Sequence, residues 1–166
     1  MDEQARKTAL RMIPYGIYVM TAEAKGQPPA AATVNWVTQT SFSPPLVAIG
    51  VKTDSGVYAA TRAAGNFVLN VLGKGQQGAA FTFFKPAELE DGKLSGEAIE
   101  WAANGAPMLK SAAAAIECKL VHVVELGDHH TFIGEVTNVH LNKEPEGRPD
   151  EAILEMKDLG EKVFYG

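Results

Sequence analysis

The chain has 166 residues, of which 46% are hydrophobic and 21% charged, and its formal net charge is −5 at pH 7. This composition is typical of one globular domain, and the lack of clustered Lys and Arg argues against a nucleic acid partner. The single cysteine, Cys118, excludes an internal disulfide and a cysteine-based metal cluster. Apolar runs are too short to span a membrane and the N-terminus has no signal-like pattern, so we expect a soluble cytoplasmic protein with no membrane partner.

The first part of the chain predicts a helix followed by a β-hairpin. Residues Asp2–Ile13 carry apolar side chains at the spacing of one buried helix face, and Pro14 ends the helix. The segments 16–21 and 31–42 are rich in strand-forming residues and are joined by a turn that contains Gly and Pro. We therefore expect the first two strands to pair.

The stretch 31–51 is where we expect a ligand. Its first half alternates between an apolar and a polar face, and the bend Ser43-Pro44-Pro45 leads into an apolar strand, Leu46–Val51, that should be covered on both sides. Lys and Glu would solvate a surface strand, so a row of short polar side chains indicates a ligand wall. The apolar face carries Val34, Trp36 and Phe42, and the polar face carries Thr33, Asn35, Gln39 and Ser41.

The next segment, Lys52-Thr53-Asp54-Ser55, suits a phosphate group. It follows a strand and precedes a predicted helix, Gly56–Ala64, which Gly65 ends. Free N–H groups and the positive end of the helix dipole would meet a lysine and two hydroxyls there. The alternative is an ordinary helix cap formed by Asp54 or Ser55, with Lys52 in solvent.

The remaining chain predicts more strands with short helices between them. The absence of βαβ alternation favours a mainly β fold, an antiparallel barrel with peripheral helices, formed by a single domain of residues 1–166. A long polar excursion inside a compact domain is often functional, for instance as a flap. We expect a strand at 66–72, a helix at 76–84, a partly ordered excursion at 87–105, a hairpin at 112–142 and a surface tail at 143–166 that docks at its end.

One apparent nucleotide motif is rejected. Residues 73–78 read Gly-Lys-Gly-Gln-Gln-Gly and match the pattern G-x-G-x-x-G between a strand and a helix. Pro86 then cuts the helix, and polar residues 88–92 follow where a dinucleotide-binding unit needs a second apolar strand. We interpret the motif as a strand-to-helix turn.

The histidines are weighed as metal ligands and as pocket residues. His129 and His130 are expected at the tip of the last hairpin, beside Asp128, and adjacent strand residues point to opposite faces. His122 and His140 have no acidic residue at ligand-like spacing, so we predict no metal site. His129 either reaches over a ligand pocket or is solvated.

Aromatic residues are concentrated in the first half of the chain. Most should form the core, but a planar ligand also needs such walls. We expect the segment 81–85, with Phe84, to lie at the rim of a pocket.

Several stretches in a fixed order resemble one family. They are AATVNWVTQTSFSPPLVAIGVKTDS from residue 31, GNFVLNVL from 65, APML from 106, AAIECKLV from 114 and GDHHTFIGEV from 127. Together they make the chain resemble, from about Pro14 to Val139, the flavin reductase-like, FMN-binding split β-barrel family. The resemblance implies an antiparallel split barrel, a homodimer and one FMN per subunit near the dimer interface.

The resemblance also implies site residues. The family's Gly-Asp-His hairpin tip, which approaches the nicotinamide side of the flavin in some members, corresponds to Gly127-Asp128-His129, so we assign His129 to positioning the donor. The segment Glu23-Ala24-Lys25 and the excursion 85–105 depart from the family pattern. The cofactor contacts correspond to Thr33, Val34, Asn35, Trp36, Thr40 and Ser41 for the flavin and to Lys52, Thr53 and Ser55 for the phosphate.

Two neighbouring site residues cannot both contact the flavin through their side chains. Asn35 and Trp36 point to opposite faces of a regular strand. Either the strand is kinked near 33–36, or several contacts come from the backbone. We favour the backbone, with Trp36 packing in the core or across the dimer.

Three functions are compared. The first is an FMN-dependent oxidoreductase that accepts a hydride from NAD(P)H and passes electrons to free flavin, a metal chelate or a partner redox protein. The second is an FMN-containing electron carrier reduced by a protein donor; the ending with Asp158-Leu159-Gly160 and Phe164-Tyr165-Gly166, similar to flavoredoxins, favours it. The third is a flavin-free haem- or ligand-binding barrel. We favour the first.

Overall fold

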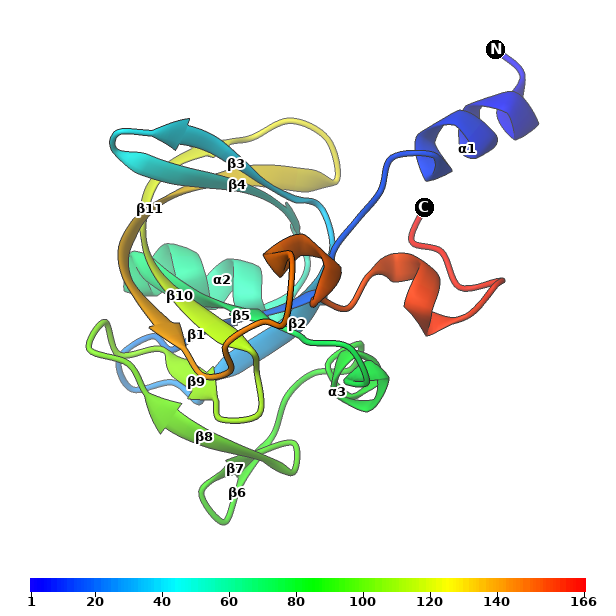
Figure 1. Ribbon diagram of the computed structural model, residues 1–166. Coiled ribbons are helices and arrows are strands. Elements are labelled where there is room, and N and C mark those ends of the chain that lie inside the picture. The colour runs from blue at the N-terminus through cyan, green and yellow to red at the C-terminus, as the bar shows by residue number, and fades with distance from the viewer.

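The computed structural model describes all residues, 1–166 (Figure 1). Its helices are α1 (Glu3–Arg11), α2 (Gly56–Ala64) and α3 (Gln77–Thr82), with two 3-10 turns, η1 (Pro149–Glu151) and η2 (Met156–Leu159). Its strands are β1 (Tyr18–Ala22), β2 (Ala30–Val34), β3 (Val37–Phe42), β4 (Pro45–Lys52), β5 (Asn66–Val71), β6 (Leu89–Glu90), β7 (Lys93–Leu94), β8 (Glu97–Trp101), β9 (Pro107–Leu109), β10 (Ala114–Val124) and β11 (His129–Leu141).

Seven strands form one antiparallel sheet that curls into a barrel. Their order is β2-β1-β5-β10-β11-β4-β3. The two outermost strands, β2 and β3, follow each other in the chain with only Asn35 and Trp36 between them, so the sheet has to curl until its ends meet. Figure 1 shows the result, and it confirms the predicted mainly β, antiparallel split barrel.

The break at Asn35 and Trp36 differs from the single strand that the alternation predicts for 31–42. Up to Val34 the chain pairs with β1, and from Val37 onward it pairs with β4. The chain therefore changes its partner strand within two residues, and the predicted polar row is divided between two elements. Of the two alternatives for 33–36, the structure has the kink.

The interior of the barrel is filled by large apolar side chains. Phe67 of β5, Ile49 of β4 and Phe132 of β11 are completely buried. Cys118 packs among them, and burial raises the pKa of its thiol to about 12, with a contribution from the negative charge of Glu117. This confirms that the cysteine is a packed residue, because a thiol with such a pKa stays protonated at neutral pH.

The hairpin of β10 and β11 is confirmed, and it contains a polar cluster that the sequence reading missed. Glu117 is 2% exposed and is hydrogen-bonded to His140 (2.6 Å), to the side-chain amide of Asn138 (3.1 Å) and to the backbone N–H of Asn104 (3.1 Å). Burial alone would raise the pKa of this carboxyl, but the hydrogen bonds outweigh burial and lower the pKa. The sequence spacing around His140 gave no sign of this acidic partner, because strand pairing brings together residues far apart in sequence.

The excursion at 87–105 is ordered, which corrects the expectation of a partly ordered flap. Together with β9 it forms a second antiparallel sheet, β6-β7-β8-β9, below the barrel in Figure 1. Leu94 and Leu109 of this small sheet are completely buried. Asn70 of β5 joins the two sheets, since it accepts from the N–H of Leu109 (2.9 Å) and donates to the carbonyl of Val19 (2.9 Å).

Helix α1 has no buried residue, which corrects the predicted buried face. The helix begins after the N-cap Asp2 and projects from the barrel, so Leu10 is 55% exposed and Ile13, just beyond it, is 50% exposed. The apolar residues of α1 do lie on one face of the helix, but no other element of the chain covers that face. None of the helices is both long and apolar enough to cross a membrane.

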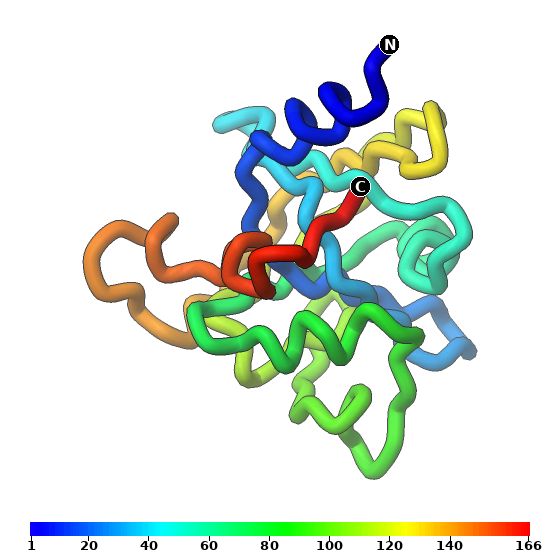
Figure 2. The backbone as a smooth tube through the Cα atoms, turned by 90° about the vertical axis from the view of Figure 1, so that its right-hand side faces the viewer, coloured from blue at the N-terminus to red at the C-terminus, as the bar shows by residue number.

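The tail at 143–166 packs along much of its length and does not merely dock at its end. Leu154 and Leu159 are buried, and the N–H of Leu154 donates to the carbonyl of Leu72 (2.8 Å). Figure 2 shows the tail crossing the face of the molecule, with its last residues running between α1 and α3.

Gly134 of β11 offers a test of the barrel core. A Cβ at this position would stand 2.6 Å from Cζ of Phe67, a completely buried ring that cannot move without displacing its neighbours. We expect Gly134→Ala to lower the free energy of unfolding by about 1–3 kcal/mol in urea titrations. Gly78→Ala in α3 is the control, because nothing lies within 4 Å of its added Cβ. Equal stabilities of the two variants would contradict the packing described.

Candidate functional site

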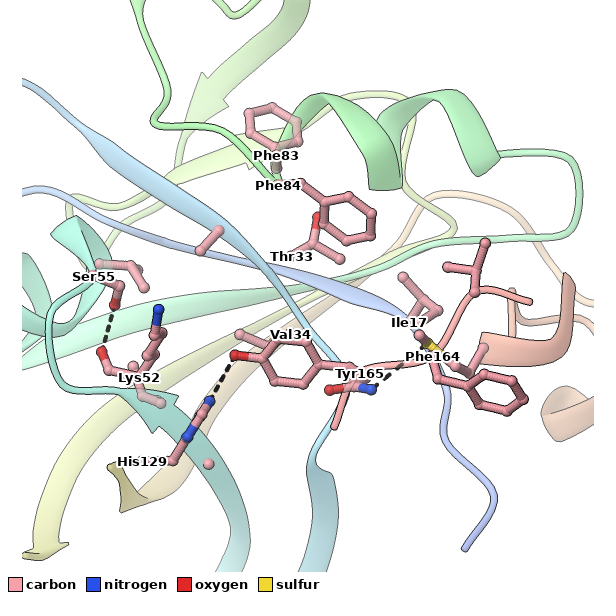
Figure 3. Close-up of a pocket in the computed structure, with 17 residues that line it drawn as sticks. Ile17, Thr33, Val34, Lys52, Ser55, Phe83, Phe84, His129, Phe164 and Tyr165 are labelled. Carbon is pink, nitrogen blue, oxygen red and sulfur yellow. Dashed lines mark hydrogen bonds between the residues drawn. The ribbon is translucent and has the colours of Figure 1, made fainter. Parts of the chain in front are cut away.

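A cleft of about 280 Å³ opens where β2, the start of α2, the end of α3, the start of β11 and the tail meet (Figure 3). Eleven of its seventeen lining residues are hydrophobic. Ligand sites in proteins have this character, with mostly apolar walls and a few placed polar groups. The segments that build the cleft are far apart in the sequence, so the barrel is what brings them together.

Most of the predicted site residues line this cleft. They are Thr33, Val34, Asn35, Lys52, Ser55, Phe84 and His129. Four others do not line it. Thr40 and Ser41 lie on β3, which the break at 35–36 carries away from the cleft. Thr53 is turned toward the carbonyl of Asp128, to which its hydroxyl donates (3.2 Å), and Trp36 lies behind the wall.

Trp36 supports the cleft from outside. Its ring centroid is 4.5 Å from that of His129 and 5.2 Å from that of Tyr165. The backbone N–H of Gly50 donates to the carbonyl of Trp36 (2.8 Å), which holds the broken strand against β4. Of the two alternatives for Trp36, packing in the core is corrected, because the ring is only partly buried and lies against two ring residues at the mouth of the cleft; packing across a dimer stays a prediction.

The apolar end of the cleft holds one under-used amide. Asn35 is 6% exposed, and its amide nitrogen has only the sulfur of Met156 as a partner, at 3.7 Å. A thioether is a weak acceptor, so most of the hydrogen-bonding capacity of Asn35 remains for a ligand. Nearby, Thr33 donates to the carbonyl of Ala80 (2.7 Å) and thereby fixes α3, from whose end Phe84 reaches the rim.

The opposite end of the cleft carries a lysine and a helix N-terminus. Ser55 is the N-cap of α2, which confirms the cap interpretation, and it also lines the cleft: its hydroxyl accepts from the N–H of Tyr58 (3.2 Å) and donates to the carbonyl of Lys52 (2.8 Å). Lys52 is paired with Asp54 at 3.5 Å, but both side chains are more than half exposed. Such a pair contributes about 0–1 kcal/mol, so an anion in the cleft can displace it.

A hydrogen-bonded chain of three side chains closes the mouth of the cleft. His129 Nδ1 lies 2.8 Å from Asp128 and its Nε2 lies 2.7 Å from the hydroxyl of Tyr165, as Figure 3 shows for the latter. The carboxylate can only accept, so Nδ1 donates to it and a neutral imidazole then accepts from Tyr165 at Nε2. The bond from His129 lowers the pKa of Asp128, and burial raises the pKa of Tyr165. His130 points the other way, toward Tyr58 (2.8 Å), which confirms that the two histidines serve opposite faces.

Sequence reasoning missed ten of the seventeen lining residues. Six of them lie in the barrel and its helices, namely Ile17, Ala32, Gly50, Val51, Val57 and Phe83, and the tail supplies the other four, Met156, Val163, Phe164 and Tyr165. The apolar run at 163–165 in an otherwise charged tail did predict that the end of the tail docks on the domain. It did not predict that the tail docks at the cleft. No three His, Cys, Asp or Glu side chains are grouped so that they could hold a metal ion.

Comparison with known proteins identifies the family. A family model described as a flavin reductase like domain matches residues 10–157. The NADH:FMN oxidoreductase of Rhodococcus qingshengii is 32% identical over 142 residues, which cover 84% of this chain and 71% of that protein. The chain belongs to the flavin reductase-like domain family.

Two further relatives show how far the similarity extends. The stachydrine N-demethylase reductase subunit Stc3 of Rhizobium meliloti is 33% identical over 138 residues, 82% of this chain and 58% of that protein. The solved styrene monooxygenase flavin reductase of Pseudomonas putida S12 has a TM-score of 0.70 at 28% identity, with 81% of this chain and 85% of that one covered. The chain spans only 58%, 25% and 43% of the lengths of three of its curated relatives.

Proposed function

We propose that this chain is a flavin reductase domain that binds FMN in the cleft, accepts a hydride from NAD(P)H and passes electrons to free flavin, a metal chelate or a partner redox protein. The observation that carries the proposal is the presence, in one cleft, of apolar walls together with a lysine and a helix N-terminus at Lys52 and Ser55. The similarity to the Rhodococcus NADH:FMN oxidoreductase supports the choice of FMN and of a nicotinamide donor.

The residues present fit FMN. A volume of about 280 Å³ is near the lower end of small-molecule pockets and suits a planar ring with a phosphate-bearing chain attached. Apolar side chains would cover the ring, and the amide of Asn35, whose nitrogen has only the weak sulfur acceptor of Met156, would bond to the polar edge of the ring. Lys52, Ser55 and the first N–H groups of α2 would hold the phosphate.

The chemistry divides between cofactor and protein. FMN supplies the redox chemistry when bound, and the protein supplies binding, orientation and access. Lys52 and the start of α2 fix the phosphate, while Asn35 orients the ring. His129, held by Asp128 and backed by Trp36, is placed to position the nicotinamide donor at the mouth of the cleft.

We also propose a cytoplasmic homodimer. The exposed apolar side chains Leu10, Met12 and Ile13 follow one another where α1 leaves the barrel, at 55%, 75% and 50% exposure. A second copy would remove this surface from water. The single, buried Cys118 suits a reducing compartment.

One observation favours the electron carrier as the second candidate function. Tyr165 already occupies Nε2 of His129, the residue assigned to positioning the donor. Anaerobic mixing of the FMN-loaded protein with NADH or NADPH separates the two functions. We expect loss of the oxidised flavin absorbance with a nicotinamide; reduction by a protein donor alone would establish the carrier instead.

The double variant Lys52→Ala/Ser55→Ala tests the phosphate site. We expect it to weaken FMN binding by about 1–3 kcal/mol, because charge-assisted hydrogen bonds to the phosphate are lost. Fluorescence titration of FMN measures the dissociation constant. Lys52→Ala alone keeps the helix cap intact, and Lys93→Ala, an exposed lysine on the small sheet, is the charge control. An unchanged dissociation constant in the double variant would place the anion elsewhere.

His129→Ala tests the donor position. We expect kcat/KM for NADH or NADPH to fall about tenfold, as the loss of one hydrogen bond of about 1.4 kcal/mol would cause, while FMN remains bound. His130→Ala is the matched control, since that ring lies on the opposite face. Steady-state kinetics equal to those of the unmodified protein would remove His129 from this role.

A further inference from the structure

The last four residues of the tail, Val163–Gly166, cover the mouth of the cleft. Val163, Phe164 and Tyr165 all line it, yet Phe164 is 47% and Tyr165 44% exposed. They therefore lie over the opening, with one side toward the cleft and the other toward solvent. We call this segment the cover.

The inner side of the cover is attached to the donor-positioning histidine. The hydroxyl of Tyr165 lies 2.7 Å from His129 Nε2, and its ring rests near Trp36, 5.2 Å between centroids. The imidazole has only two nitrogens, and Nδ1 is held by Asp128. While Tyr165 is in place, His129 has no nitrogen left for another partner.

The outer side of the cover is attached to α1. Arg11 donates two hydrogen bonds, of 3.1 and 3.0 Å, to the carbonyl oxygen of Gly166, and its guanidinium lies 4.3 Å from the ring centroid of Phe164. Arg11 does not line the cleft. The cover is thus held at two places, only one of which belongs to the site.

The cover can leave without unfolding the rest of the tail. Leu159, just before it, is 7% exposed and stays in the core, whereas Val163 is only partly buried against the core and residues 164–166 are exposed. Between them lies Gly160 with φ 138°, a conformation that side-chain-bearing residues rarely adopt and that suits a hinge. Segments with few buried contacts open at low free energy.

We propose that Val163–Gly166 is an autoinhibitory cover that competes with the nicotinamide donor for His129 and is held closed from outside by Arg11. The proposal rests on the proposed function, because it takes the donor to bind against His129. Only the fraction of molecules with the cover displaced accepts the donor, so the donor's apparent affinity is reduced by that fraction. Release of Arg11, for instance by a rearrangement of α1, then increases the affinity for the donor.

The first test follows the cover itself and not turnover. Trypsin cleaves after Lys162, which is exposed and adjoins the cover. In FMN-loaded protein we expect saturating NAD⁺ to increase the rate of cleavage at Lys162, measured by mass spectrometry, several-fold over FMN alone. Cleavage at Lys143, earlier in the tail, is the internal reference. An unchanged or slower cleavage at Lys162 overturns the proposal.

The second test releases the outer attachment and leaves the cleft residues intact. We expect Arg11→Ala to lower the dissociation constant of NAD⁺ about 3- to 10-fold, the range expected when a minor open state becomes common, with FMN affinity unchanged. Lys7→Ala removes the same charge from the same helix without contacting the cover, and should have no effect. If NAD⁺ binding stays the same or weakens in Arg11→Ala, the proposal of an autoinhibitory cover is overturned.

A chain shortened to residue 162 separates this proposal from the proposed function. We expect it to bind FMN and to bind NAD⁺ more tightly than the full chain. If the shortened chain binds FMN but its NAD⁺ binding is unaltered or undetectable, the proposal of the cover is overturned and the proposed function is not. Failure of the full chain to bind FMN would instead contradict the proposed function, and fluorescence titration of FMN shows this independently.

Discussion

The missing side chain of Gly50 is the constraint on which the site depends. A Cβ there would stand 3.1 Å from the ring of Trp36, so glycine lets Trp36 lie across β4 and accept the N–H of Gly50. This contact holds the place where β2 gives way to β3 and the barrel closes. Because β4 pairs on its other edge with β11, the same strand sets Lys52 opposite His129. Lys52 and His129, the residues proposed to meet the phosphate and the donor, therefore share one supporting strand.

Local chemistry made much of the fold predictable. Helix α2 begins after Ser55 and ends at Gly65 as its cap residues indicate, and Lys52 and Ser55 lie where a strand end meets a helix start. The break at Asn35–Trp36 could not be predicted from the sequence. Apolar and polar residues keep alternating through it, although the partner strand changes there. That change is a tertiary event, and it moved Thr40 and Ser41 out of the site.

Other errors share a cause: contacts between distant segments. Order in the small sheet depends on Asn70, and the setting of His140 depends on Glu117 across a strand pair. The role of Tyr165 in the cleft follows from a tail that returns across the whole molecule. Each residue has an unremarkable sequence neighbourhood, so no local pattern marks it. The family resemblance supplied the barrel but not these contacts, because it rests on short stretches of the chain and does not show which side chains meet.

The two tryptophans of the chain are divided between the two sheets in a useful way. Trp101 lies on the small sheet, hydrogen-bonded to Glu23, while Trp36 stands behind the rings of His129 and Tyr165. The indole nitrogen of Trp36 is buried without a partner and the ring is partly exposed, so its emission depends on the packing of these two neighbouring rings. The protein thus carries a built-in optical reporter at the mouth of its cleft, and a distant one that serves as its reference.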